Sequence, residues 1–160
     1  MKNLKNVVLK SAVAFAAAIL CISFAHAQNI DKSTIQNFIK GKTLIFKAQT
    51  VMPLTGSVRT LTSEYELKLS GDSLTCYLPY FGRAYSAGYG EGGAINFTTT
   101  KFEYKATQRK KGGWDISIYP KDVNDVRVLN LTVFEKGYGN LQVLSNNRQP
   151  IAFTGFVERK

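Results

Sequence analysis

The chain has 160 residues, of which 44% are hydrophobic and 20% are charged, and 21 Lys and Arg against 11 Asp and Glu give a formal charge of +10. This balance is that of a folded globular protein and excludes a disordered chain. Thirteen Gly and four Pro exclude collagen-like and Pro-rich classes, and the length predicts a single domain. One His and two Cys provide little material for a metal site or a disulfide framework.

The first 27 residues have the character of an export signal. A basic start is followed by an uncharged segment, 11–25, in which Ala, Ile and Phe predominate, and Ala25, His26 and Ala27 supply the small–x–small pattern of signal peptidase sites. The apolar run of about 15 residues is shorter than the roughly 20 that span a bilayer. We therefore predict a signal peptide over 1–27, cleaved after Ala27, and a periplasmic or secreted protein. An uncleaved membrane anchor and a lipoprotein acylated at Cys21 are the alternatives.

Cleavage would change the composition of the chain. Removing 27 of 160 residues leaves 133, and because the removed segment carries three Lys and no acid, the formal charge falls from +10 to +7. The single His and Cys21 leave with the signal, so Cys76 is the one cysteine of the mature chain. The mature protein then has no internal disulfide and depends on its hydrophobic core. No transmembrane segment is predicted after cleavage.

The mature chain is predicted to begin with a short helix and to continue as strands. The segment 31–40 has a helical period, with Asp31 or Ser33 as the cap at its start and Gly41 at its end. From Thr43 on, the hydrophobic period changes to two, which is typical of strands with one buried face. Together with Gly- and Asn-rich turns, this alternation predicts about eight strands: 43–52, 57–69, 73–78, 94–108, 113–119, 125–135, 140–146 and 150–158.

The order of these elements predicts an all-β fold. No helical period lies between the strands, which excludes parallel βαβ folds. The alternation changes phase between Phe97 and Phe102 and again between Val128 and Leu131, and such shifts indicate bulges or bends in a sheet that curls on itself. Short turns favour an antiparallel up-and-down meander. We therefore predict a single lipocalin-like β-barrel domain over 28–160, with the short N-terminal helix at or near one end. A two-sheet sandwich is the alternative.

The segment 78–94 breaks the strand pattern. It is 17 residues long and holds four aromatic residues, five Gly and one Pro. Loops of this length are uncommon unless they are functional or flexible, and aromatic side chains need a surface on which to pack. The segment is therefore either a structural plug that closes the barrel end or a lid over a ligand. In the second interpretation, the ligand-binding residues are Tyr80, Phe81, Arg83, Tyr85 and Tyr89.

The string LPYFGRAY at 78–85 resembles the signature of a family of exported proteins, found mainly in Bacteroidetes and catalogued as domain of unknown function 4251. The similarity extends through the glycine-rich stretch up to Phe97, the Gly-Gly-Trp-Asp-Ile turn at 112–116, and the terminal Asn-Arg-Gln at 147–149 with Gly155. The resemblance implies an exported, all-β, lipocalin-like domain. It implies no activity and no catalytic residues.

Motifs for nucleotide binding and catalysis lack the context that they require. The stretch 88–93 matches G-x-G-x-x-G, but a predicted strand follows it where a dinucleotide site needs a helix. Without His, the mature chain cannot form a Ser–His or Cys–His pair, and Cys76 alternates in register with Leu74 and Leu78 as a core thiol. We predict no catalytic residue. An enzyme that uses Asp or Glu with Tyr remains open, with Glu91 and Glu103 as the acids in or near the 78–94 segment.

No cofactor, metal ion or nucleic acid is predicted to bind. Zinc and copper sites normally use His or Cys, and the acidic string 122–125 is too short for a calcium loop of the EF-hand kind. The basic run 109–111 lies at a predicted hairpin tip and the other bases are scattered, whereas nucleic-acid binding needs a contiguous basic face. The leading hypothesis is a non-catalytic periplasmic module that binds a small apolar or amphipathic ligand. The alternative is a cell-envelope interaction or scaffold protein with a solid barrel, which contacts another protein or a glycan.

Overall fold

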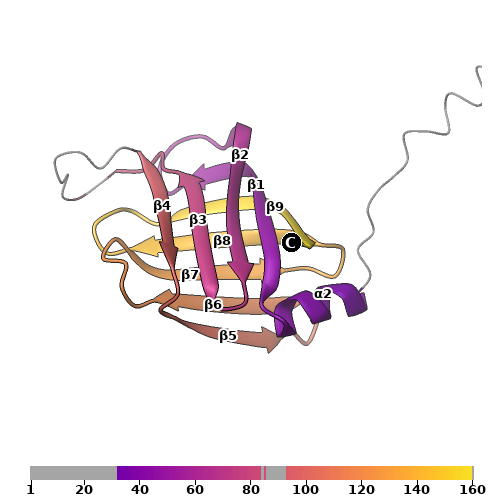
Figure 1. Ribbon diagram of the computed structural model, residues 1–160. Helices are drawn as coiled ribbons and strands as arrows, with labels where there is room; N and C mark the ends of the chain where they lie inside the picture. Colours follow the sequence, from indigo (N-terminus) through magenta and orange to yellow (C-terminus); the bar gives the residue numbers. More distant parts are fainter. Residues whose placement is uncertain (1–31, 84, 86–92, 160) are drawn as a thin grey trace, which may run out of the picture.

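The computed structural model describes residues 32–83, 85 and 93–159. These residues form one short helix followed by nine strands, as Figure 1 shows. The elements are α2 (Lys32–Lys40), β1 (Thr43–Pro53), β2 (Arg59–Ser70), β3 (Ser73–Pro79), β4 (Ala94–Thr99), β5 (Phe102–Gln108), β6 (Trp114–Pro120), β7 (Val126–Val133), β8 (Tyr138–Ser145) and β9 (Ile151–Arg159).

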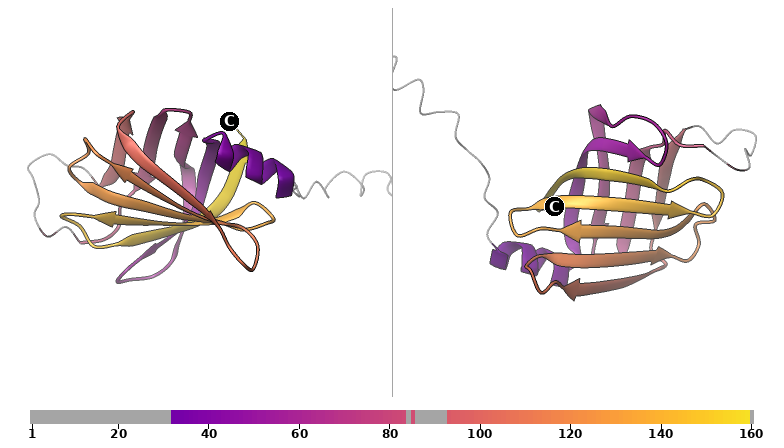
Figure 2. Two further views of the ribbon diagram at one scale, coloured as in Figure 1. Left: turned by 90° about the horizontal axis from the view of Figure 1, so that it is seen from below. Right: turned by 180° about the vertical axis from the view of Figure 1, so that it is seen from behind.

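All nine strands belong to one antiparallel sheet, in the order β4-β3-β2-β1-β9-β8-β7-β6-β5. Strands that follow one another along the chain are neighbours in the sheet, except β4 and β5, which end the order on opposite sides. The sheet curls so that β1 to β4 lie across β5 to β9, with the two sets of strands running in steeply different directions (Figures 1 and 2). The result is a nearly closed barrel, which confirms the predicted lipocalin-like meander.

The barrel has one more strand than predicted because the segment 94–108 forms two strands. β4 ends at Thr99 and β5 begins at Phe102, so the phase change between Phe97 and Phe102 is a turn and not a bulge. The turn is fixed by Thr99, whose Oγ1 accepts a hydrogen bond from the Lys101 backbone N–H at 2.9 Å and donates to the Asp122 carboxylate. The second phase change corresponds to a register shift between Val126 and Val128, where β7 pairs with β8.

β1 and β9 hold the two layers of the barrel together. β1 pairs with both β2 and β9, and in both pairings its register shifts between Ala48 and Thr50. A bulge of this kind bends a strand, which allows β1 to take part in both layers. Gly155 of β9 pairs with Ala48 at this point, and a Cβ on Gly155 would overlap the carbonyl oxygen of Lys47. The sequence analysis did not predict this bulge.

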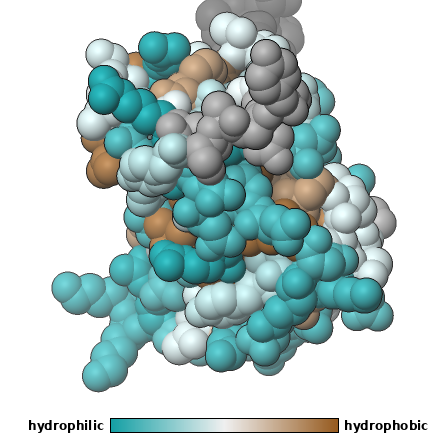
Figure 3. Space-filling model, turned by 90° about the vertical axis from the view of Figure 1, so that its left-hand side faces the viewer, coloured by the Kyte–Doolittle hydropathy of each residue, from teal (hydrophilic) through white to brown (hydrophobic). Residues whose placement is uncertain are grey.

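The described residues of the β3–β4 connection lie together with the β6–β7 and β8–β9 connections at one end of the barrel, which Figure 3 turns toward the viewer. We call this end the loop end. α2 lies toward the opposite side of the barrel, beside β5 and the start of β1 (Figure 1). The described part of the chain holds no helix that is long and apolar enough to cross a bilayer.

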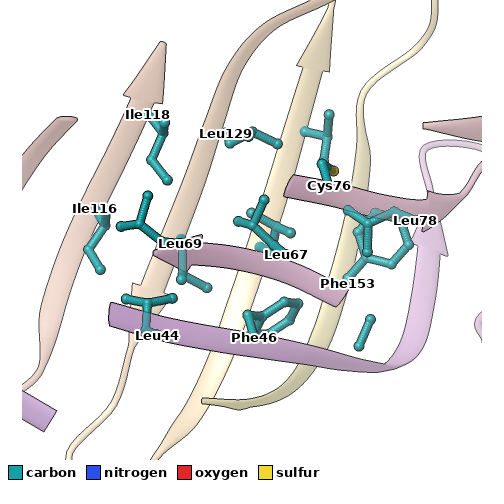
Figure 4. Close-up of a cluster of buried hydrophobic side chains, with 14 of the residues drawn as sticks. Leu44, Phe46, Leu67, Leu69, Cys76, Leu78, Ile116, Ile118, Leu129 and Phe153 are labelled. Atoms are coloured by element: carbon teal, nitrogen blue, oxygen red, sulfur yellow. The ribbon is translucent and has the colours of Figure 1, made fainter. Parts of the chain in front are cut away.

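The interior between the two layers is filled by apolar side chains, as the close-up in Figure 4 shows. Leu44 and Phe46 of β1 and Leu67 of β2 are fully buried, and so are Ile118 of β6 and Phe153 of β9 on the opposite layer. Each such side chain contributes roughly 1.5–3 kcal/mol by leaving water. Cys76 is buried in the same cluster, as predicted, and burial raises the pKa of its thiol.

α2 packs its apolar face on this core. Ile35, Phe38 and Ile39 are buried, as the helical period predicted, whereas the predicted cap Asp31 lies outside the described residues. The Tyr104 hydroxyl donates a hydrogen bond to the Ile39 carbonyl oxygen at 3.0 Å and ties the end of the helix to β5.

The helix ends at Lys40, directly before the predicted Gly41, and Lys42 has a left-handed backbone conformation. The Gly41 N–H donates to the Asn37 carbonyl oxygen at 2.9 Å. The positive φ of 50° belongs to Lys42, whose ammonium lies 5.6 Å from the centre of the Tyr104 ring. Lys42 thus adopts a backbone conformation that is usual for Gly, and its ammonium contacts the Tyr104 ring.

The close approach of β9 to β1 predicts the effect of Gly155→Ala. Because the added Cβ meets backbone atoms that cannot move aside, we expect a loss of about 3 kcal/mol or more in the free energy of unfolding, measured by urea denaturation. Gly71→Ala is the matched control. Gly71 has a φ of 62° but open space around its Cα, so this variant is expected to lose only about 1–2 kcal/mol. Equal losses in the two variants would contradict the steric argument.

The partly buried phenol of Tyr104 predicts a pH dependence of stability. Burial raises the pKa of Tyr104 from 10.0 to about 12, so its contribution to stability is complete below pH 10 and is lost as the pH rises through about 12. We expect Tyr104→Phe, which cannot ionise, to lessen the fall in stability between these pH values, and to cost about 1 kcal/mol at neutral pH through the lost hydrogen bond to Ile39. The exposed Tyr77→Phe is the control, and an unchanged pH profile in Tyr104→Phe would refute the prediction.

Candidate functional site: a pocket at the loop end

A pocket of about 760 Å³ opens at the loop end of the barrel. Figure 3 shows hydrophobic surface exposed at this end between hydrophilic side chains. The pocket is bordered by β2, β3 and β4 on one side and by the β6–β7 and β8–β9 connections on the other. Its described lining residues are Tyr65, Tyr77, Pro79, Phe81, Gly93, Ala94, Ile95, Asn96, Phe97, Val123, Asp125, Val126 and Arg148.

Aromatic side chains form much of the wall on the side of β2, β3 and β4. The rings of Tyr65 and Tyr77 lie against each other, with their centres 5.3 Å apart. Phe81 is 41% exposed, and the guanidinium of Arg59 lies 5.0 Å from the centre of its ring. Phe97 is half-buried and packs on the core. Rings held in this way offer a large, rigid apolar surface at little cost in side-chain entropy.

A buried ion pair forms the polar part of the wall. The side chain of Arg148 is only 8% exposed, and its Nε lies 3.2 Å from Oδ2 of Asp125. The guanidinium also lies over the ring of Tyr80, 5.1 Å from its centre. A charge this deeply buried requires a partner of opposite sign. Asp125 and Tyr80 together therefore fix the position of Arg148 in the wall of the pocket.

Tyr80 ties the segment after β3 to the β8–β9 connection. Its hydroxyl proton is shared between two carbonyl oxygens, of Arg83 at 2.9 Å and of Gln149 at 3.1 Å. The Gln149 N–H donates in return to the Arg83 carbonyl at 3.0 Å. Burial raises the pKa of Tyr80, which keeps the phenol neutral and able to donate. A Cβ on Gly82 would lie 2.5 Å from the Tyr80 hydroxyl oxygen, so a larger residue there would have to displace this ring.

We call the residues Tyr80, Arg83, Asp125, Arg148 and Gln149 the clasp. The clasp joins three connections that are distant in the sequence: β3–β4, β6–β7 and β8–β9. The clasp also brings together residues of the strings 78–85 and 147–149, on which the resemblance noted in the sequence was based. The described part of the 78–94 segment thus has a structural role at the barrel end and also borders the pocket.

The predicted ligand-binding residues occupy different environments. Phe81 lines the pocket, whereas Tyr80 is buried and its hydroxyl is bonded to the backbone. The Arg83 side chain is exposed and its backbone makes the contacts of the clasp. Tyr85 is 70% exposed, and its N–H donates to the Asn147 carbonyl at 2.7 Å. Tyr89 lies outside the described residues, so the prediction for it stays a prediction.

The sequence analysis missed the lining residues Tyr65, Tyr77 and Phe97 and the ion pair of Asp125 with Arg148. Tyr65 and Phe97 lie in register with apolar residues two positions away and alternate with polar neighbours, so they looked like ordinary core positions. Asp125 was considered only as part of the acidic string 122–125, and Arg148 only as part of the Asn-Arg-Gln string. The one signal that pointed to Arg148 was its place in the Asn-Arg-Gln string, on which part of the resemblance was based.

Few of the carboxylates in the described part of the chain lie at the pocket. In the described part of the chain, no group of three or more His, Cys, Asp or Glu side chains is placed to hold a metal ion. Glu103 forms an ion pair with Lys121 at 3.2 Å and does not line the pocket, and Glu91 lies outside the described residues. Asp125 is the carboxylate among the described lining residues, and it is engaged by Arg148.

These features define a small antiparallel β-barrel domain with a filled interior and a pocket at one end. The chain matches the family described as Domain of unknown function (DUF4251) over residues 26–157 and belongs to that family. Its fold is similar to that of a DUF4251 family protein from Bacteroides eggerthii, known from a crystal structure, with a TM-score of 0.63 and 15% sequence identity over 83% of this chain and 90% of that chain. No curated protein matches the chain. The family assignment confirms the resemblance noted in the sequence.

The clasp predicts that Arg148 stabilises the loop end. Arg148→Met keeps much of the side-chain volume but leaves the Asp125 carboxylate without this guanidinium, so we expect a loss of about 3 kcal/mol in the free energy of unfolding, measured by urea denaturation. Arg83→Met is the matched control, because the exposed Arg83 contributes its backbone and should lose no more than about 0.5 kcal/mol. A loss in Arg148→Met as small as that of the control would contradict this role.

Proposed function

We propose that this protein is a non-catalytic module that binds a small apolar or amphipathic ligand in the pocket at the loop end. The observation that carries the proposal is the aromatic wall of Tyr65, Tyr77 and Phe81 beside the buried ion pair of Arg148 with Asp125. Small-molecule sites are typically concave and mostly apolar, with a few polar groups held in fixed positions. The volume of about 760 Å³ also falls within the usual range of such sites.

The ligand site that we propose lies at the end of the barrel and not along its axis. Fully buried side chains such as Phe46, Leu67 and Phe153 fill the space between the two layers. Filled interiors leave voids hardly larger than a water molecule. A ligand in the loop-end pocket would contact the described ends of the 78–94 segment, through Pro79 and Phe81 before it and Gly93 and Ala94 after it.

We also propose that the protein is exported, with cleavage after Ala27 and a mature chain that begins at Gln28. The basic start, the short apolar run and the Ala-His-Ala pattern at 25–27 support this proposal. Export would place the pocket in the periplasm or outside the cell, where it could meet small molecules or fragments of the envelope.

The second candidate is a cell-envelope interaction or scaffold protein. It is favoured by the filled interior and by apolar side chains exposed in the described part of the chain near the loop end and in the β1–β2 connection. Among these are Phe81, Tyr85, Leu54 and Val58. Exposed apolar side chains that cluster on one face are typical of contact surfaces.

Native mass spectrometry of the protein purified from its own host tests the first proposal. We expect a bound small molecule whose mass adds to that of the chain beginning at Gln28. The same spectrum reports the start of the mature chain and hence the predicted cleavage. An unliganded mass, together with no thermal shift across a library of lipids and other amphipathic compounds, would overturn the ligand-binding proposal. A specific protein or glycan captured by crosslinking in cells would then favour the second candidate.

The aromatic wall predicts which variants weaken binding. With the compound identified by mass spectrometry, we expect the double variant Tyr77→Ala and Phe81→Ala to lower affinity at least about tenfold, because two exposed rings of the wall are lost. Tyr138→Ala is the matched control, since Tyr138 is 53% exposed and does not line the pocket. Isothermal titration calorimetry measures the affinities, and equal affinities for the double variant and the control would count against the pocket as the ligand site.

A further inference from the structure

The loop-end pocket borders the free edge of β4. β4 ends the strand order of the sheet, so in the described part of the chain it pairs with β3 on one side only. The consecutive residues Gly93 to Phe97 all line the pocket. Successive side chains of a strand point to opposite faces, and accordingly Ile95 is buried while Asn96 is exposed. A pocket lined by both therefore reaches around the edge of the strand.

The opposite wall makes this edge one side of a groove. Val123, Val126 and Arg148 line the pocket from the β6–β7 and β8–β9 connections and the start of β7. In Figures 1 and 2 these connections extend beyond β4 at the loop end. The free edge of β4 therefore lies opposite the side chains of Val123, Val126 and Arg148, and the groove separates them.

Edge strands carry backbone N–H and C=O groups that point away from the sheet, and an extended chain can pair with them. Natural edges are commonly protected by charged side chains. β5, the other edge of this sheet, follows that rule with the exposed Glu103 and Lys105. β4 does not, because its six residues from Ala94 to Thr99 carry no charge. The edge that borders the pocket is thus the one without charged side chains.

We propose that the groove binds an extended peptide, whose backbone pairs with β4 as an added strand and whose apolar side chains enter the pocket beside Tyr65, Tyr77 and Phe81. This proposal rests on the proposed function, since it names the class of ligand for the same pocket. Strand addition supplies affinity through main-chain hydrogen bonds, and pockets for alternate side chains supply selectivity. A short peptide with apolar side chains is also amphipathic and fits a pocket that combines aromatic walls with a buried ion pair.

Capped hexapeptides test the proposal. The library has threonine at alternate positions and phenylalanine, tyrosine, leucine or valine at the others, and binding is followed by fluorescence anisotropy. We expect the best binder to slow hydrogen exchange of the amides at 94–98 in β4. The amides at 102–108 of β5 are the internal control and should be unaffected, because that edge borders no part of the pocket. No binder in the library, or a binder that leaves exchange at 94–98 unchanged, would overturn the proposal.

N-methylation of the best binder separates backbone pairing from side-chain binding. One derivative is methylated at the odd-numbered amides and the other at the even-numbered amides, so only one of them loses the groups that face β4. We expect that derivative to bind at least about tenfold more weakly and the other to bind as the parent peptide does. Equal affinities of the two derivatives, whether both retained or both lost, would overturn pairing with β4.

The two proposals fail in different ways. If the two derivatives bind equally while the double variant Tyr77→Ala and Phe81→Ala loses affinity, the pocket binds ligands through side chains alone, and only the pairing with β4 is refuted. If no library peptide binds while the protein from its host carries another small molecule, only the peptide proposal is refuted, and if neither a peptide nor any other small molecule binds, both proposals are refuted.

Discussion

The barrel depends on the close passage of β9 over β1. At the bulge between Ala48 and Thr50, Gly155 approaches the backbone of Lys47 so closely that no larger residue fits. This contact pairs the first strand of the chain with the last. Because the first and last described strands are joined in this way, the opening in the barrel falls between β4 and β5. The position of the pocket beside β4 follows from that opening.

The clasp then determines the shape of the loop end. The aromatic ring and hydroxyl of Tyr80 join Arg148 and the backbone of two connections, and Asp125 balances the buried charge. These contacts hold the ends of the 78–94 segment against the barrel, so that Phe81 and Gly93 stand at the pocket wall. A single set of contacts thus serves both interpretations of this segment, as a structural closure and as the border of a binding site.

Because the core between the two layers is filled, the pocket of this small barrel lies at its end and not inside it. The side chains between the layers provide stability in a domain whose described Cys76 is a free, buried thiol. The pocket is left where the strands separate, since β2 pairs with β3 only up to Glu66 and Tyr77, and the ring of Tyr65 lies just beyond. Side chains that lie where β2 and β3 separate are not packed into the core and stay accessible to a ligand.

Much of the architecture could be read from the alternation of side chains. Period two along the chain determined the strands and their buried faces, and the helical spacing of Ile35, Phe38 and Ile39 determined α2, because these patterns depend only on local geometry. The phase change between Phe97 and Phe102 predicted a bulge or bend, but the division into two strands at 100–101 was not predicted, because this turn contains neither Gly nor Pro and is fixed by Thr99 and Asp122, which are distant in sequence. The bulge in β1 escaped because its cause, Gly155, lies at the far end of the chain.

Most of the site was decided by the tertiary structure, although the sequence predicted Phe81. Asp125 and Arg148 become an ion pair, and Tyr65 and Tyr77 a stacked wall, only when the sheet curls and brings their strands and connections together. A basic and an acidic residue 23 positions apart look no different in sequence from solvated surface charges. The sequence determined which faces are buried, since burial follows hydrophobic periodicity. The fold decided which polar and aromatic groups meet, since their contacts depend on strand order and register.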